Sequence, residues 1–302
     1  MLKQLLKDLE EIYSKNFKDI ALHRDMIGYV CVVSDPKDKY ILKLFKNRNA
    51  KQAKQSIEIM NYLEKSDFPT AHIIPTADGV SYFIYDFEGE DRIGVLYELI
   101  NGTEPDKSTD IIAIGRQTGI LHKMMNDSPL FLSYHDKPFF IDRYIQCLQE
   151  MNYQRIDEFE EYGNRLWNRV KNLPRSFCHG DYHTGNMILN SCGQYVLFDF
   201  DAASKAFSMY DIAVFCDMTN YFKLSEHEYE DTRYMLEEFM KGYNEFNTVS
   251  DQELTAIFSF IAIRHYEVQA TIIENLGIEC IDKEFVDDQL EWLRKWEKLI
   301  RQ

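Results

Sequence analysis

The spacing of apolar and polar residues divides the chain into a strand-rich first third and a mostly helical remainder. Two helices are predicted in the first third, over residues 2–17 and 49–65, because apolar side chains recur there every three to four positions. Four runs rich in β-branched and aromatic residues predict two hairpins, formed by residues 29–33 with 40–45 and by residues 80–87 with 93–100, the latter around a turn at 88–92.

Turn and breaker residues at positions 101–105 end this pattern. Beyond them, helices are predicted over residues 108–126, 139–151, 155–171, 209–222, 227–246, 251–275 and 284–300. One β-like stretch, residues 187–199, interrupts the helices. The sequence therefore predicts an α+β protein with a small β-rich lobe (residues 1–100) and a larger helical lobe (residues 101–302). A cleft between two such lobes is the usual place for a ligand.

Composition narrows the classes of protein that fit this pattern. The chain has 302 residues, 45% of them hydrophobic, and 34 Lys and Arg against 50 Asp and Glu, which gives a net charge of −16. So acidic a surface disfavours binding to nucleic acid or anionic lipid. There is no run of 18 apolar residues, and acidic residues stand near the N-terminus where a signal peptide needs an apolar stretch. We therefore expect a soluble, cytoplasmic protein, with its six cysteines as reduced thiols.

The negative charge is concentrated after residue 100. Residues 1–100 hold 14 basic and 16 acidic side chains, so the remainder holds 20 and 34. The excess either forms a solvated surface that aids solubility or attracts a cationic small molecule.

One loop carries the most specific residue pattern in the chain. The sequence His-Gly-Asp ends at Asp181, and Asn186 follows five residues later. Two apolar runs around a turn at residues 190–193 predict a tight hairpin, which brings Asp199 back beside the loop. These three side chains offer oxygen donors, which suit a hard cation such as Mg²⁺ bound to phosphate. A carboxylate beside such a metal can accept a proton from an attacking hydroxyl, and phosphoryl transfer needs little else from side chains.

The pattern H-G-D-x-x-x-x-N, followed 13 residues later by D-F-D, resembles the aminoglycoside phosphotransferase/choline kinase family of small-molecule kinases. The resemblance covers most of the chain, because the predicted order of elements also agrees. It implies a bilobal, protein-kinase-like fold in which residues 1–100 bind the nucleotide and residues 101–302 carry the catalytic loop and the acceptor pocket. It also implies that Asp181 is the catalytic base and that Asn186 and Asp199 hold Mg²⁺.

Further residues receive roles from the same resemblance. Lys43 lies mid-strand and would grip the nucleotide phosphates, although an edge-strand lysine that deters aggregation is the alternative. Glu58 stands on the next helix where the family has a glutamate that pairs with this lysine; the alternative is a helix-surface charge. The carbonyl of Glu98 and the amide of Ile100 match the hinge that contacts the nucleobase, and this backbone recognition leaves ATP and GTP equally open. Asp211 matches the aspartate that supports the catalytic loop.

The chain departs from protein kinases in two places. The first turn of the β-rich lobe offers only Gly28 in place of a glycine-rich phosphate loop. Asp201 replaces the glycine of D-F-G and adds a carboxylate beside the metal. It could contact a second ion or the acceptor, or it could only begin the next loop.

The acceptor pocket is expected among the helices that follow Asp211. Three acidic residues are candidates for binding an amine-bearing alcohol: Asp217, Glu267 and Glu274. Three aromatic residues could stack on such a cation: Phe258, Phe260 and Tyr266. The role of His265, beside Arg264, is equally ambiguous. Each has a structural alternative, as a surface charge, a cap or a core side chain.

Together these observations predict a kinase that uses Mg²⁺ to transfer the γ-phosphate of ATP or GTP to a hydroxyl of a small, cationic metabolite or aminoglycoside-type antibiotic. Its partners are the nucleotide and this substrate, without nucleic acid or membrane, and the oligomeric state stays open. One alternative is a nucleotide-binding scaffold without catalysis, which the simplified phosphate loop favours and the presence of Lys43, Asp181, Asn186 and Asp199 disfavours. Another is a protein kinase, which the H-G-D loop and the lack of an A-P-E segment disfavour.

Overall fold

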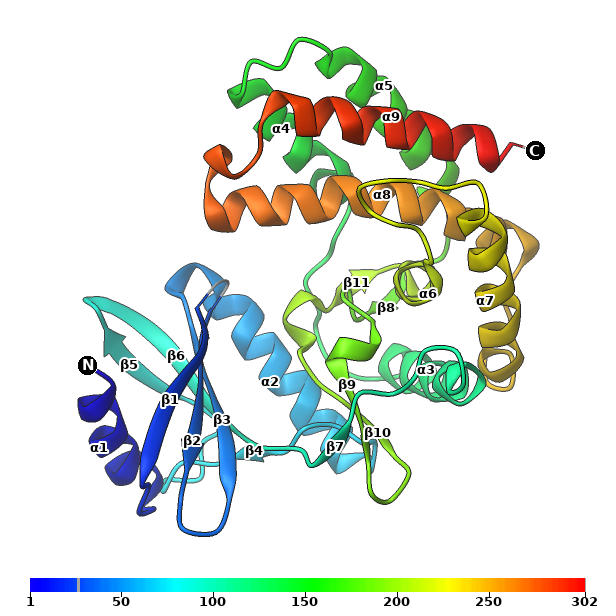
Figure 1. Cartoon of the computed structure of the whole chain (residues 1–302). Helices are drawn as coiled ribbons and strands as arrows, with labels where there is room; N and C mark the ends of the chain where they lie inside the picture. The colour runs from blue at the N-terminus through cyan, green and yellow to red at the C-terminus, as the bar shows by residue number, and fades with distance from the viewer. Residues whose placement is uncertain (26–27, 302) are drawn as a thin grey trace. The chain divides into compact units, whose positions relative to one another are not determined.

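The computed structural model describes residues 1–25 and 28–301, which divide by their contacts into two compact units. The first unit comprises Met1–Pro105 and Gly185–Ala202, and the second comprises Asp106–Thr184 and Ala203–Gln302. The predicted α+β class is confirmed, with an antiparallel sheet in the first unit and helices through most of the second (Figure 1). This division differs from the predicted boundary at residue 100 in one segment, since residues 185–202 group by their contacts with the first unit.

Both predicted hairpins are present in a six-stranded antiparallel sheet. Its strands are β1 (Asp19–Asp25), β2 (Gly28–Ser34), β3 (Lys39–Phe45), β4 (Ile73–Ile74), β5 (Phe83–Phe87) and β6 (Glu90–Glu98). Their order is β1-β2-β3-β6-β4, and β5 also pairs with β6. The β5–β6 turn is shorter than predicted: Glu88 and Gly89 both have positive φ, which is the backbone that a two-residue hairpin loop requires, so β6 already begins at Glu90.

The edge strand β1 is absent from the sequence prediction. Only Ile20 of its seven residues is buried, and the strand pairs with β2 alone. Its sequence, DIALHRD, has adjacent apolar residues followed by adjacent polar ones, so the alternation that marks a strand is missing.

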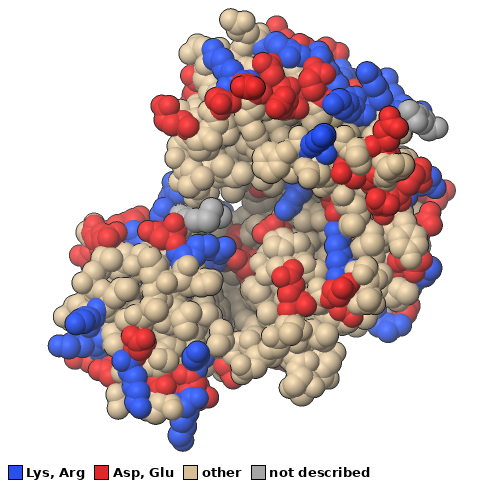
Figure 2. Space-filling view, viewed as in Figure 1, with Lys and Arg blue, Asp and Glu red and all other residues tan. Residues whose placement is uncertain are grey.

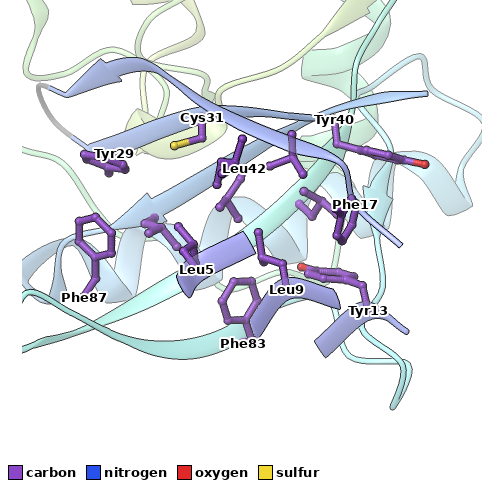
Figure 3. Packing of buried hydrophobic residues seen from close by; sticks show 14 residues of the cluster. Leu5, Leu9, Tyr13, Phe17, Tyr29, Cys31, Tyr40, Leu42, Phe83 and Phe87 are labelled. Carbon is purple, nitrogen blue, oxygen red and sulfur yellow. The ribbon is translucent and has the colours of Figure 1, made fainter. Parts of the chain in front are cut away.

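Helix α1 (Leu2–Tyr13) covers one face of the sheet. Three of its side chains are buried in a cluster with residues of β2, β3 and β5 (Figure 3). From β3 this cluster takes Tyr40, Leu42 and Leu44, which are alternate residues. Because successive side chains of a strand point to opposite faces, Lys43 lies on the face away from α1.

A smaller sheet explains why residues 185–202 belong to the first unit. It consists of β7 (Gly102–Thr103), β9 (Met187–Asn190) and β10 (Tyr195–Leu197), in the order β10-β9-β7. The carbonyl of Leu197 also accepts hydrogen bonds from the Ala71 amide at 3.2 Å and from the Thr70 hydroxyl at 3.0 Å. Helix α2 (Ala50–Lys65) contacts β4, β6 and the turn at Phe200–Ala202. Hydrogen bonds to the Leu197 carbonyl thus connect the β9–β10 hairpin to the rest of the first unit.

The second unit is built from seven helices among its described residues. They are α3 (Ile111–Asn126), α4 (Arg143–Glu150), α5 (Ile156–Val170), α6 (Ser208–Cys216), α7 (Glu228–Tyr243), α8 (Asp251–Leu276) and α9 (Lys283–Leu299). Two short strands, β8 (Ser176–Cys178) and β11 (Ser204–Ala206), pair beside them, and a π-helical turn (Pro138–Asp142) precedes α4. Helix α6 is shorter than predicted because Asp217 leaves the helical backbone and its carboxylate accepts the Thr219 amide instead.

Charged side chains of both signs are intermixed over α5 and α9 (Figure 2). Arg155 pairs with Asp287 at 3.0 Å, and Arg165 pairs with Glu297 at 3.3 Å. Ion pairs therefore neutralise some of the acidic side chains of α9. Within the described range, no helix combines the length and the apolar composition that crossing a membrane requires.

His265 lies on the buried side of α8 and gives the fold a testable pH dependence. Its ring stacks on Tyr221, with 4.4 Å between centroids, and Nδ1 lies 2.7 Å from the Gln289 Oε1. Burial lowers the pKa of His265 from 6.5 to about 4, although the Gln289 hydrogen bond acts in the opposite direction. The unfolded chain therefore binds a proton between these pH values while the folded chain does not, so stability falls as the pH falls.

We expect the free energy of unfolding to lose up to about 3 kcal/mol between pH 6.5 and pH 4 through this group. Urea denaturation across this range should show a smaller loss in His265→Gln than in the wild type. The exposed His227 provides the control, since His227→Gln should leave the pH dependence unchanged. Equal pH dependence in the wild type and His265→Gln would refute this assignment.

Candidate active site

A cavity of about 390 Å³ lies within the first unit, on the sheet face away from α1. Its apolar wall includes Val30, Ile41 and Ile188, and its charged residues include Lys43 and Asp199. The register of the sheet pairs Val30 with Lys43 and Ile41 with Tyr97, which places these side chains on one face. The cavity therefore has an apolar wall together with a cluster of charge.

Lys43 joins this charge cluster from the middle of β3. Its Nζ lies 2.9 Å from Asp199 Oδ1 and also forms an ion pair with Asp201 Oδ2. Only 13% of the lysine side chain is exposed. Burial acts against its charge, but Asp199 and Asp201 outweigh burial and raise the pKa of Lys43, so the ammonium stays charged. Burial, with the neighbouring charge of Asp199, raises the pKa of Asp201 to about 6, although Lys43 opposes this shift.

The β9–β10 hairpin brings Asn186 and Asp199 together, as its sequence predicts. The Phe198 amide donates to the Asn186 carbonyl at 3.1 Å, directly beyond the last paired residues of the two strands. Asp199 itself has φ 64, a left-handed backbone that non-glycine residues rarely adopt. Asn186, Asp199 and Asp201 all line the cavity.

These side chains fit a magnesium ion held jointly with phosphate. Across residues 1–25 and 28–301, no group of three or more His, Cys, Asp and Glu side chains is arranged to hold a metal ion by itself. Mg²⁺ in phosphate-transfer sites uses one or two carboxylates together with substrate phosphates and water, so it does not need such a cage. Asp199, Asp201 and the Asn186 amide provide a donor set of this kind.

The hinge candidates Glu98 and Ile100 also line the cavity. The Glu98 amide donates to His72 O at 3.0 Å and the Leu99 amide donates to Lys39 O at 3.1 Å. These bonds fix the backbone where β6 ends. The Glu98 carbonyl and the Ile100 amide remain the predicted contacts for a nucleobase.

The predicted pairing of Glu58 with Lys43 is not found. Glu58 is exposed, and the ion pairs that Lys43 forms in the described structure are those with Asp199 and Asp201. At 100° per residue, position 58 falls on the solvent face of α2 beside Lys54. The α2 residues that line the cavity are instead Ser56 and Met60.

His23 and Arg24 are cavity residues that the sequence interpretation missed. Both belong to β1, the strand without an apolar alternation, so no pattern marked them. The turn ahead of Gly28 includes residues 26–27, which lie outside the described residues. Arg24 adds a second permanent cation to the wall that carries Lys43.

Asp181 belongs to a loop of the second unit that Asp211 holds in place. The Asp211 carboxylate is fully buried and accepts the His179 amide at 2.7 Å, the Gly180 amide at 2.8 Å and the Cys178 thiol at 3.3 Å. His122 Nε2 lies 3.0 Å from the same carboxylate. Gly180 has φ 85, a backbone that glycine adopts without strain. The residues before Asp181 are therefore fixed by one buried acid.

Asp211→Ala should destabilise the chain by about 3–5 kcal/mol, because several buried donors lose their acceptor at once. Urea denaturation measures the effect directly. The exposed acid Asp231 on α7 is the matched control, and Asp231→Ala should change stability by less than about 0.5 kcal/mol. Similar small effects in both variants would show that Asp211 does not organise the loop.

Asp181 has two cationic or ionisable neighbours in the second unit. Arg264 Nη2 donates to its Oδ1 at 3.2 Å, and His183 Nε2 lies 3.3 Å from its Oδ2. Burial acts to raise the pKa of Asp181, but the hydrogen bond from His183 and the charge of Arg264 outweigh burial and hold that pKa well below its usual range. The carboxylate is therefore ionised and able to accept a hydrogen bond. The pairing with Arg264 had no signal in the sequence, because the two residues are 83 positions apart.

The acidic candidates for the acceptor pocket already have partners. Arg143 pairs with Glu274 at 2.7 Å and with Glu267 at 3.5 Å. The Asp217 carboxylate accepts the Thr219 amide at 2.8 Å. Three of the aromatic and imidazole candidates, Phe260, Tyr266 and His265, are buried core residues. Phe258 packs against Tyr229 and Trp296.

A family model and a similar kinase both relate the chain to phosphotransferases. A family model described as "Phosphotransferase enzyme family" matches residues 21–243, well over half of the chain. An amicoumacin kinase of Bacillus subtilis is 23% identical over 299 residues, which cover 93% of this chain and 88% of that protein. An uncharacterised protein of Deinococcus radiodurans is 29% identical over 138 residues, a match that spans 44% of this chain and 39% of that protein.

Solved structures show the same fold. An amicoumacin kinase in complex with AMP-PNP, Ca²⁺ and Ami has a TM-score of 0.77 at 20% identity, covering 99% of this chain and 92% of the other. A microcompartment-associated aminopropanol kinase has a TM-score of 0.76 at 16% identity, covering 98% and 95%. The predicted protein-kinase-like fold is confirmed by these similarities.

Proposed function

The chain belongs to the phosphotransferase enzyme family, and from this premise we propose that it transfers the γ-phosphate of ATP or GTP to a hydroxyl group of a small molecule. The observation that carries the proposal is the cavity of the first unit, where Lys43 pairs with Asp199 and Asp201 beside an apolar wall. An apolar wall suits a nucleobase, and clustered charge suits phosphates with their metal.

In this proposal the first unit binds the nucleotide. The Glu98 carbonyl and the Ile100 amide would contact the base, which lies against Val30 and Ile41. Lys43 and Arg24 would place positive charge on the phosphates. Asn186 and Asp199 would hold Mg²⁺, which when bound neutralises the charge of the phosphate oxygens.

Asp181 would act on the acceptor. Its ionised carboxylate would accept a hydrogen bond from the attacking hydroxyl and take the proton as the new oxygen–phosphorus bond forms. Only four residues separate Asp181 from Asn186, so the chain limits their separation to about 17 Å. The proton acceptor and the phosphate site are therefore on one short stretch of chain.

Two observations support a small acceptor with an amine. The similar structures include an aminopropanol kinase and an amicoumacin kinase. Residues 101–302 carry 34 acidic side chains against 20 basic ones. We also propose that the reaction takes place in the cytoplasm, since all six cysteines in the described chain are free thiols.

The test is nucleotide turnover with pooled acceptors. ADP and GDP release are measured from ATP and GTP with Mg²⁺, against pools of amino alcohols, hydroxy amino acids, sugars and aminoglycosides. We expect at least one pool to raise release above the acceptor-free rate, and chelation of Mg²⁺ to abolish the increase. Nucleotide binding without acceptor-stimulated release from any pool would favour the catalytically silent scaffold.

A further inference from the structure

Arg264 is a cation beside Asp181 with most of its hydrogen-bonding capacity unused. A guanidinium has five N–H donors, and in the described structure the one hydrogen bond of this side chain runs from Nη2 to Asp181. Nη1 is covered by protein and has no partner among the described residues. The side chain as a whole nevertheless keeps 23% of its surface exposed. Leaving buried donors unpaired is costly, which points to a partner that the protein does not supply.

The neighbouring acids do not supply that partner. Glu267 accepts from Tyr210 at 3.2 Å and Thr271 at 2.9 Å, and it pairs with Arg143 at 3.5 Å. In the part of the chain that the structure describes, Asp181 is the carboxylate within ion-pair distance of Arg264. Asp181 is also the residue that the reaction needs for the hydroxyl.

A second cation lies in the same neighbourhood. Lys107 Nζ donates to the Asp217 carbonyl at 2.7 Å and lies 5.7 Å from the centre of the Phe215 ring. Burial, and to a smaller extent the positive charge of Arg264, lower the pKa of Lys107. Although the chain as a whole is acidic, Lys107 thus lies within electrostatic range of Arg264, and Arg264 pairs with Asp181.

We propose that the acceptor carries an anionic oxygen group, most simply a carboxylate, and that Arg264 binds it. This inference rests on the proposed phosphotransferase function. A carboxylate matches the planar fork of a guanidinium and would use donors that the protein leaves free. Drawing Arg264 toward the ligand would also remove a competing donor from Asp181, so the carboxylate of Asp181 could accept the hydroxyl instead. The proposed acceptor can carry an amine as well as this carboxylate. Hydroxy amino acids, which have a hydroxyl, an amine and a carboxylate, are therefore the favoured class of acceptor.

The test compares molecules that differ only by the carboxylate. The pairs are L-serine with ethanolamine, L-homoserine with 3-aminopropanol, and glycerate with glycerol. Binding to the full chain with Mg²⁺ and AMP-PNP is measured by titration calorimetry. We expect the carboxylate member of at least one pair to bind about 10- to 100-fold more tightly than its partner. If no carboxylate member binds more tightly than its partner, including the case of no detectable binding, the inference is wrong.

Variants of Arg264 separate binding from positioning. In Arg264→Gln the ratio of affinities within the pair should fall to about one, and Arg264→Lys should retain part of it because the charge remains. If Arg264 only positioned Asp181, its variants would leave the ratio of affinities unchanged and would lower the turnover of both members of the pair. Arg233→Gln, at an exposed arginine of α7, is the matched control and should leave the ratio intact. Thermal unfolding checks that each variant is folded.

Different results would overturn the proposed phosphotransferase function and the proposed role of Arg264. Phosphoryl transfer to acceptors without any preference for the carboxylate would leave the proposed function standing and overturn the role of Arg264. Tight carboxylate-dependent binding without transfer to any acceptor would support the Arg264 site and count against the proposed function.

Discussion

Asp181→Asn is expected to lower kcat by about 10³-fold while nucleotide affinity stays within about twofold of the wild type. The substitution keeps the size of the side chain and removes the negative charge that accepts the proton of the hydroxyl. Nucleotide affinity should persist because the lining of the first-unit cavity includes Lys43 and Asp199 but not Asp181.

This prediction is measured in two assays on one preparation. Turnover is followed as acceptor-stimulated ADP release, and affinity is followed by calorimetric titration with AMP-PNP. Asp231→Asn, at an exposed position of α7, should behave like the wild type in both. Retained turnover in Asp181→Asn would remove Asp181 from the mechanism, and loss of nucleotide binding would show that its role is structural.

Asp199→Asn is expected to lower kcat/KM by about 10²- to 10³-fold and to raise the Mg²⁺ concentration needed for half-maximal rate by at least about tenfold. The reason is the loss of one of the two carboxylates in the donor set. Lys43 would still have Asp201 as a partner, so the local fold should be retained.

The Asp199 prediction is checked by ADP release over a series of Mg²⁺ concentrations. The exposed Asp91 of β6 gives a matched control, since Asp91→Asn changes charge equally without touching the cavity. A magnesium dependence that is the same in Asp199→Asn and the wild type would contradict the assignment of this carboxylate to the metal.

Local patterns account for the parts of the site that the sequence could predict. Asn186 and Asp199 flank a hairpin with a short turn, so strand pairing alone brings them together. Lys43 follows from alternation within β3, because its neighbours Leu42 and Leu44 face the α1 core. In both cases a few consecutive residues determine where the side chain points.

The positions of three residues could not be predicted from short stretches of sequence. Arg24 lies on a strand whose exposed side chains give no periodic signal. Glu58 was assigned by spacing from Lys43, but the rotation of α2 places Ser56 at the cavity and Glu58 in solvent. Arg264 meets Asp181 only through the packing of α8. Tertiary packing, which no short window of sequence contains, decides each of these three outcomes.

The central claim is transfer of a phosphoryl group from nucleotide to a small hydroxyl compound. Its most direct test is mass spectrometry of the acceptor after incubation with Mg²⁺ and ATP or GTP, beside the Asp181→Asn variant. The account predicts an acceptor heavier by one phosphoryl group, formed in equal amount to the nucleoside diphosphate and nearly absent with the variant. Nucleoside diphosphate formed with free phosphate and an unmodified acceptor, or equal product from both proteins, would contradict it.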